Sequence, residues 1–259
     1  MRPLPELDAS GVTALLFDID DTLTTGGRLT AAAYGALERL KQAGKRVVAV
    51  TGRPAGWCDH IARMWPVDAV VGENGAFYFA FAQGRLEKRF QEDAAARAAK
   101  RARLDAIAKA IFAAVPGCAI ASDQPYRETD LAIDYCEDVP PLPLAQVRRI
   151  VAIMEAEGLT AKASSIHVNG WFGGYDKLAM TRMLYSELFA TQWVAGMPGT
   201  VFVGDSPNDA PMFEAFANSV GVANVRRFEG LLAAKPQYVT HASCGAGFAE
   251  LATHLLQGR

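Results

Sequence analysis

The segment Phe-Asp-Ile-Asp-Asp-Thr-Leu-Thr at residues 17–24 places two carboxylates where they could do chemistry together. Along an extended backbone, residues two apart point the same way, so Asp18 and Asp20 can address one site. Such a pair could bind a divalent cation, or act as a nucleophile and an acid–base catalyst. A calcium loop is disfavoured, because the glycine that its pattern requires is missing. Taken alone, the segment is equally compatible with two aspartates that only form a turn.

A second pair of acids occurs in Gly-Asp-Ser-Pro-Asn-Asp at residues 204–209. Asp205 and Asp209 follow another apolar run, at residues 200–203. Aspartates beside glycine and proline often do no more than shape a turn. The coincidence of two acidic turns at two predicted strand ends favours a shared site.

Two weaker signals accompany the acids. Thr51-Gly52-Arg53 precedes a predicted helix, and the exposed N–H groups of a helix start can bind phosphate. The same pattern is also common as ordinary helix capping. In Asp176-Lys177 the lysine could supply a positive charge, although a single lysine usually lies on the surface.

Short, valine-rich apolar runs precede most of these groups and predict strands that are buried on both faces of a parallel sheet. The runs are residues 12–17, 46–50, 68–71, 200–203, 219–222 and 237–239. Helical patterns separate them, at residues 30–43, 54–65 and 211–217. We therefore predict an α/β fold with a doubly wound, Rossmann-like parallel sheet. Ligands bind at the carboxyl ends of such strands, where Asp18, Thr51 and Asp205 are expected.

The middle of the chain has a different pattern. It predicts a hairpin, a long alanine-rich helix, a strand, a second helix and a further strand, at residues 76–90, 93–115, 129–135, 144–157 and 166–171. We interpret this region as an α+β domain, residues 78–171, inserted into a core domain. The core domain is predicted to consist of residues 1–77 and 172–259.

In this order, the motifs DxDxT, Thr, Lys and GDxxND are similar to those of the haloacid dehalogenase-like hydrolases, and the resemblance covers nearly the whole chain. The insertion after the second motif resembles members that carry a large α/β cap there. They include Cof-like sugar phosphatases, sucrose-phosphate phosphatase, mannosyl-3-phosphoglycerate phosphatase and phosphomannomutase. Residues 204–212 and 245–250 look most like the mannosyl-3-phosphoglycerate phosphatase branch. Many cap-bearing members have glycine after the lysine, whereas this chain has Leu178 and is closer to phosphomannomutase there.

The resemblance implies a phosphatase that depends on Mg²⁺ and acts through an aspartyl phosphate. Asp18 would be the nucleophile, Asp20 the acid and base, and Lys177 a catalytic group that also binds the phosphoryl oxygens. The implied metal ligands are Asp18, Asp20 (through its backbone carbonyl), Asp205 and Asp209. The substrate-binding residues predicted in the core are Thr51, Gly52, Arg53, Lys177 and Asn208. Asn208 could instead join Thr22 in orienting the acids.

The inserted domain is expected to recognise the leaving group through Arg127 and His167. Alternation along the predicted strand places His167, Asn169 and Trp171 on one face. Facing the core, these side chains could bind a sugar, and Arg127 could meet a carboxylate or a second phosphate. Alternatively, Arg127 pairs with Glu128 or Asp130 in solvent, and Trp171 packs the hinge.

Bulk composition restricts the partners. The net charge of −2 and the pI near 6.1 provide no broad positive field for nucleic acid or an anionic membrane. No apolar stretch approaches the roughly 18 residues that a membrane span needs. The four cysteines are scattered, which disfavours a disulfide framework or zinc site and suits the cytoplasm. We expect a small phosphorylated partner, a sugar phosphate or sugar-acid phosphate, and leave the oligomeric state open.

Two other functions remain open. A sugar phosphomutase would return the phosphoryl group to another hydroxyl instead of to water, and Leu178 favours this reading. A phosphate sensor without catalysis is disfavoured, since a sensor needs no nucleophile and Asp18, Asp20 and Lys177 are all present.

Overall fold

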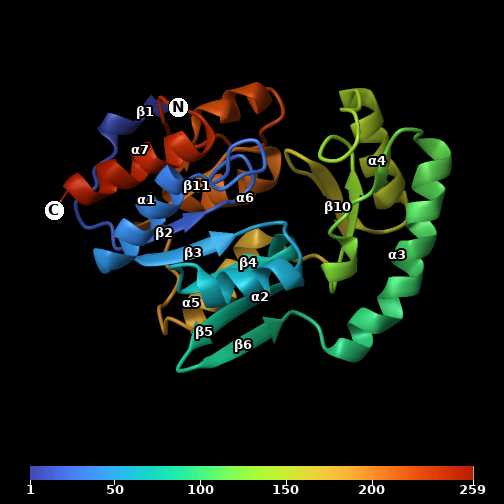
Figure 1. Ribbon diagram of the computed structural model, residues 1–259, viewed down its shortest axis with the longest axis horizontal. Coiled ribbons are helices and arrows are strands. Elements are labelled where there is room, and N and C mark those ends of the chain that lie inside the picture. The colour runs from blue at the N-terminus through green and yellow to red at the C-terminus, as the bar shows by residue number, and fades with distance from the viewer. Residues whose placement is uncertain (259) are drawn as a thin grey trace.

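The structure, a computed structural model, describes residues 1–258, and two β-sheets organise them (Figure 1). The larger sheet has nine strands. Their spatial order is β1 (Arg2–Pro3), β13 (Tyr238–Val239), β12 (Phe216–Gly221), β11 (Gly196–Gly204), β2 (Ala14–Phe17), β3 (Arg46–Val50), β4 (Ala69–Gly72), β5 (Phe77–Ala82) and β6 (Arg85–Phe90). Neighbouring strands are parallel from β1 to β4. The predicted α/β fold with a parallel sheet is confirmed.

Helices cover both faces of this sheet, which explains why its central strands are apolar throughout. On β2, Leu15 and Phe17 belong to one hydrophobic cluster and Leu16 to the other. The first cluster includes residues of α1 (Ala31–Gln42), α2 (Ala55–Met64) and α7 (Cys244–Gln257). The second includes residues of α5 (Lys177–Glu187) and α6 (Ala210–Ala215). A strand buried on both faces needs no polar alternation, so its sequence reads as one apolar run.

The hairpin of β5 and β6 belongs to the nine-stranded sheet. We predicted that the inserted domain begins within this hairpin, at residue 78. Instead, β5 pairs antiparallel with β4, and Val71 lies opposite Tyr78. Phe77 and Phe79 are completely buried in the first cluster. The hairpin therefore completes the core, and the chain leaves the core only after Phe90.

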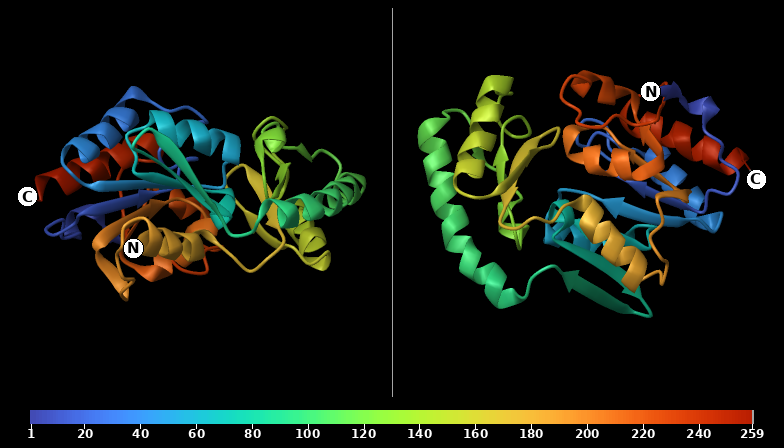
Figure 2. Two further views of the ribbon diagram at one scale, coloured as in Figure 1. Left: turned by 90° about the horizontal axis from the view of Figure 1, so that it is seen from below. Right: turned by 180° about the vertical axis from the view of Figure 1, so that it is seen from behind.

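Residues 94–171 form a separate unit, which we call the four-stranded module. Its antiparallel sheet has the order β7 (Ala119–Ile120), β8 (Leu131–Asp134), β10 (His167–Trp171) and β9 (Thr160–Ala163). The helices α3 (Ala94–Ala114) and α4 (Leu144–Ala156) pack on it in a hydrophobic cluster of their own. The views in Figures 1 and 2 show the module beside the core, with both chain termini at the far side of the core.

Several elements were not predicted. They are β1, β7, β9, α5, α7 and the 3-10 helices at Leu4–Glu6, Glu73–Gly75, Gln124–Tyr126, Pro207–Asp209 and Ala223–Phe228. The strands among them are short, and α5 lacks a clear amphipathic period. Among residues 1–258, no helix combines the length and the apolar character needed to cross a membrane.

Candidate active site

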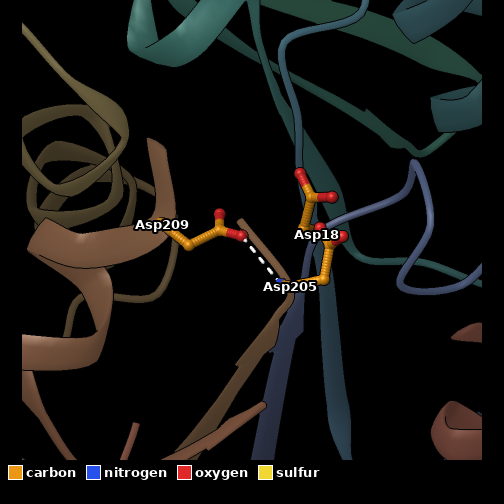
Figure 3. A group of neighbouring side chains, drawn as sticks. All are labelled: Asp18, Asp205 and Asp209. Atoms are coloured by element: carbon orange, nitrogen blue, oxygen red, sulfur yellow. Dashed lines mark hydrogen bonds between the residues drawn. The ribbon is translucent and has the colours of Figure 1, made fainter. Parts of the chain in front are cut away.

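Three buried aspartates meet at the carboxyl ends of two neighbouring strands. Asp18 directly follows β2, and Asp205 directly follows β11, which is hydrogen-bonded to β2 in parallel. Asp209 lies one turn further on, and its Oδ2 accepts a hydrogen bond of 3.1 Å from the Asp205 backbone N–H (Figure 3). One carboxylate oxygen from each residue lies within 4.8 Å of the other two. Two acidic turns that are far apart in sequence therefore form one site.

Lys177 supplies a positive charge to this cluster. It is the first residue of α5, and its Nζ lies 2.8 Å from Asp18 Oδ1 and 2.7 Å from Asp209 Oδ1. The side chain is 2% exposed, so this lysine is not a surface residue. Burial by itself would lower the pKa of Lys177, but the two carboxylates hold it above its ordinary value.

Gly75 allows the start of α5 to approach the end of β4. Its φ of 107° lies in the region that favours glycine, and a Cβ there would stand 2.0 Å from the Asp176 carbonyl oxygen. The Asp176 side chain then caps α5 by accepting a hydrogen bond of 2.8 Å from the Ala179 N–H. Together, the glycine and the cap fix where Lys177 enters the site.

The cluster carries more negative charge than Lys177 can balance. Burial raises the pKa of Asp18 to about 8, with a smaller contribution from Asp209, although Lys177 opposes the shift. Burial, together with Asp18 and Asp209, also raises the pKa of Asp205 well above its usual range. Carboxylate oxygens in such a group are ligands that suit a hard divalent cation. The donor set and its uncompensated charge therefore fit a metal ion.

Asp205 is oriented by two side chains outside the cluster. Thr22 Oγ1 donates a long hydrogen bond of 3.4 Å to Asp205 Oδ1, as expected for a residue that orients an acid. Asn224 Nδ2 donates to Asp205 Oδ2 and to the Asp21 carbonyl oxygen, both at 2.9 Å. Asn224 was not assigned from the sequence. The available signal was its place two residues after the apolar run at residues 219–222.

The loop of residues 51–53, which was predicted to bind phosphate, lies beside the acids. Thr51 follows β3, is completely buried, and accepts a hydrogen bond of 3.0 Å from the Arg53 N–H. A cavity of about 10 Å³ is lined by Gly52, Asp18 and Asn208, together with residues of the four-stranded module. This volume holds about one water molecule. The site is therefore closed over by the module in this structure.

Asn74, in the bend after β4, adds an amide near this loop. It is 3% exposed and has a positive φ of 55°. Its Oδ1 accepts a hydrogen bond of 3.4 Å from Asn208 Nδ2, while its own Nδ2 has no partner among the residues that the structure describes. Asn208 thus lines the cavity and also contacts Asn74.

The Arg53 side chain binds carboxylates of both the core and the module. Its Nε and one of its terminal nitrogens bind the Asp20 carboxylate at distances of 2.8–3.1 Å. The remaining contacts are with two acids of the module, Asp123 and Glu137. Glu137 was not assigned from the sequence, because no local motif marks an acid whose partner lies 84 positions away.

Arg127 is buried between acids. It forms a bidentate pair with Asp123, with both distances 2.9 Å, and Nη1 donates to Asp130 at 3.1 Å. Nη1 also donates to the Gly52 carbonyl oxygen at 2.9 Å. The expected pairing with Asp130 is present, but it is completely buried and not in solvent. The Arg127 guanidinium thus connects the module to the loop of residues 51–53.

The predicted face of β10 divides between two roles. His167 lines the cavity, with Nε2 located 2.8 Å from Glu137 Oε2. Asn169 Nδ2 donates to Asp130 Oδ2 at 2.9 Å, and Asn169 also lines the cavity. Trp171 is buried elsewhere, with its Nε1 donating to the Tyr175 carbonyl oxygen at 3.1 Å. Trp171 therefore packs at the junction with the core, as the alternative reading proposed.

Comparisons with known proteins agree with this geometry. Residues 15–116 match the family model for haloacid dehalogenase-like hydrolases. The matched segment is 102 of the 259 residues, and over it the chain is similar to this family. No protein of curated function matches the sequence. The resemblance inferred from the four motifs is confirmed.

Solved structures share the fold over nearly the whole length. A Thermoplasma acidophilum protein, 0175, has a TM-score of 0.70 at 17% identity, with 95% of this chain and 98% of that chain covered. The sucrose-phosphatase of Synechocystis, solved with sucrose and phosphate, has a TM-score of 0.64 at 17% identity, covering 95% and 98%. A haloacid dehalogenase-like hydrolase from Bacteroides thetaiotaomicron has a TM-score of 0.63 at 15% identity, covering 94% and 99%. The four-stranded module is therefore part of a fold shared by all three proteins.

Proposed function

We propose that this protein is a phosphatase that depends on Mg²⁺ and hydrolyses a small phosphorylated metabolite through an aspartyl phosphate on Asp18. The observation that carries the proposal is the buried contact of Lys177 with Asp18 and Asp209 at the carboxyl ends of the strands. A buried nucleophile beside a buried cation is suited to an incoming phosphate, since the cation attracts the anion that the carboxylates would repel.

The ligands proposed for Mg²⁺ are the carboxylates of Asp18 and Asp205, with Asp209 beside them. Asp20 would contribute its backbone carbonyl, because its side chain is bound to Arg53. When bound, the cation would offset the repulsion between Asp18 and the phosphate. Three buried carboxylates against one lysine agree with this assignment.

The chemistry proposed for the side chains has two steps. In the first step, an Asp18 oxygen attacks phosphorus, the bond from phosphorus to the ester oxygen breaks, and Asp20 gives its proton to that oxygen. In the second step, Asp20 takes a proton from water, whose oxygen attacks phosphorus and releases the Asp18 carboxylate. Lys177, Thr51 and Gly52 would hold the phosphoryl oxygens, where charge accumulates.

The proposed substrate is a phosphorylated sugar or sugar acid, processed in the cytoplasm. The module contributes Ile166 and several polar residues to the cavity wall, among them Ser164, Ser165, His167 and Asn169. Such groups can bind hydroxyls. A cavity of about 10 Å³ is too small for a sugar, but a larger cavity of about 260 Å³ adjoins it at Asp20 and Arg53. The sucrose-phosphatase with the same fold supports this substrate class.

The test is phosphate release from a panel of phosphorylated metabolites, with Mg²⁺ and with excess chelator. We expect release from hexose phosphates or related sugar-acid phosphates that stops when the chelator is added. Full activity in chelator would contradict the metal assignment. Following hexose phosphates by phosphorus NMR separates hydrolysis from the mutase reaction, since isomerised hexose phosphate forming faster than free phosphate would favour a mutase.

A further inference from the structure

Arg53 lies between the proposed acid–base residue and the four-stranded module. On one side, its Nε and Nη2 bind the Asp20 carboxylate at 2.8–3.1 Å. On the other side, Nη2 donates to Glu137 Oε1 at 2.7 Å and Nη1 to Asp123 Oδ2 at 3.3 Å. The Arg53 side chain is only 4% exposed. One guanidinium therefore connects a catalytic residue of the core with two acids of the module.

The planar guanidinium makes this connection stiff. A bidentate contact fixes both the distance and the plane of the carboxylate that it holds. The Trp57 ring lies against the guanidinium, with the central carbon 4.4 Å from the ring centroid. Because the plane is fixed, a displacement of Arg53 at its module side also displaces the side that holds Asp20.

Glu137 is itself held in place before it meets Arg53. Asp134, the last residue of β8, accepts hydrogen bonds of 2.8–2.9 Å from the N–H groups of Cys136, Glu137 and Asp138. The second carboxylate oxygen of Glu137 lies 2.8 Å from His167 Nε2 on the neighbouring strand β10. Glu137 thus presents one oxygen to Arg53 from a turn that is fixed by the module.

We propose that Glu137 is a positioning residue of the reaction, which holds Arg53 so that Arg53 keeps the Asp20 carboxylate in place for proton transfer. The inference rests on the proposed function, because it assumes that Asp20 is the acid. It follows that Asp20 is correctly oriented only while the module lies against the core. Proton donation would then be linked to closure of the site around a substrate.

The test compares Glu137→Gln with Asp138→Asn in the full chain. The glutamine keeps the shape of Glu137 but removes its charge. Asp138 is the matched control, because it occupies the same turn and its side chain contacts exposed Ser122, not Arg53. Each protein is assayed with substituted phenyl phosphates of similar size that differ in the pKa of the leaving phenol. Similar size keeps contacts with the module constant, so the series isolates proton donation.

We expect Glu137→Gln to lower kcat by about tenfold for the poorest leaving group, a fraction of the usual effect of a general acid, and much less for the best. A poor leaving group needs the proton, and a good one leaves without it. KM should change little, and Asp138→Asn should match the wild type. Arg53→Lys should likewise make kcat depend more steeply on the pKa of the leaving phenol. Adding Glu137→Gln to Arg53→Lys should lower kcat little further.

Equal losses for all the esters, or none, would contradict the inference by showing a purely structural role for Glu137. A crystal structure of Glu137→Gln gives a second readout that does not require activity. The inference expects the Arg53–Asp20 contact to be displaced there, and an unchanged contact overturns it. A wild-type chain that releases phosphate from none of the esters contradicts the proposed function instead, so the two failures are distinguishable.

Discussion

Charge balance around individual side chains explains most of the site. Lys177 contacts two carboxylates, while Asp205 accepts hydrogen bonds from the neutral side chains of Thr22 and Asn224. The resulting excess of negative charge in a buried space is unfavourable in the absence of a cation or a proton. The site therefore favours a positively charged ligand, and without one the excess negative charge would repel a phosphate.

Replacing Asp18 by Asn should abolish turnover and leave the fold intact. The amide cannot act as the nucleophile, so kcat should fall by more than about a thousandfold, the usual scale for such deletions. Because the pKa of Asp18 is raised to about 8 in the folded chain, its ionised form is unfavourable at pH 7, and a neutral side chain should not lower the melting temperature. Phosphate release and thermal unfolding measure the two effects. Residual activity above a thousandth would indicate direct attack by water.

Glu137 should contribute stability that depends on pH. Burial alone would raise its pKa, but His167 and Arg53 lower it from 4.5 to about 2 in the folded chain. A lowered folded pKa means that this stability is complete above about pH 4.5 and is lost as the pH falls toward 2. The wild type should exceed Glu137→Gln by up to about 3 kcal/mol near pH 7, at about 1.4 kcal/mol per pKa unit. Urea unfolding of both proteins from pH 7 to 3 checks this, and a difference that is constant with pH would contradict it.

One loop and one bend contribute to the contact between module and core. Glu73, in the bend after β4, is completely buried and accepts hydrogen bonds from the N–H groups of Ala55, Glu128 and Thr129. Arg127 adds its bond to the Gly52 carbonyl oxygen. These contacts join the loop before β8 to the start of α2. The module is therefore attached to the core next to the loop of residues 51–53.

Replacing Arg127 by Ala should act mainly on stability. It would leave Asp130 buried without its cation and Asp123 with only the 3.3 Å contact to Arg53, and breaking such a buried pair costs about 3–5 kcal/mol. Activity on a sugar phosphate and on a small aryl phosphate should fall alike. Arg148→Ala, at an exposed position on α4, is the control and should change neither property. A higher KM for the sugar phosphate alone would restore Arg127 as a substrate-binding residue.

The two units of the chain enclose the candidate site between them. The acids and Lys177 come from the core, while the opposite wall of the cavity comes from the module. Under the proposed function, this arrangement would separate the phosphoryl chemistry from the recognition of the leaving group. Metal binding to the core should therefore stabilise the chain without any contribution from the module.

Mg²⁺ should raise the melting temperature of the wild type. A ligand that binds only the folded chain stabilises it by about 2.7 kcal/mol at a hundred times its Kd. Asp205→Asn should remove the shift, whereas Asp138→Asn, far from the acids in sequence and in the module, should retain it. Thermal unfolding with a Mg²⁺ titration and with chelator measures this. A shift that persists in Asp205→Asn would place the metal elsewhere.

The sequence by itself determined the parallel sheet and the positions of its acids. Apolar runs mark strands that are buried on both faces, and Asp18, Thr51 and Asp205 follow such runs directly. Strand ends of a parallel sheet meet at one edge, so local patterns sufficed to bring these three residues together. The helices predicted at residues 30–43 and 93–115 were equally readable, because the signals that start a helix are local, and Thr30 and Asp93 cap these two helices in the structure.

Only the tertiary structure decided the partners of Arg53 and the place of the hairpin. Arg53 meets Asp123 and Glu137 of the module, which are far from it in sequence, and no local spacing selects one acid among many for such a pair. The sequence of the β5–β6 hairpin predicts the same hairpin whether β5 pairs with β4 or belongs to another sheet. The pairing of β5 with Val71 and its neighbours on β4 therefore depends on contacts outside the hairpin. Burial of Phe77 and Phe79 against the core determines that pairing, because the free energy of packing depends on surfaces that the hairpin sequence does not contain.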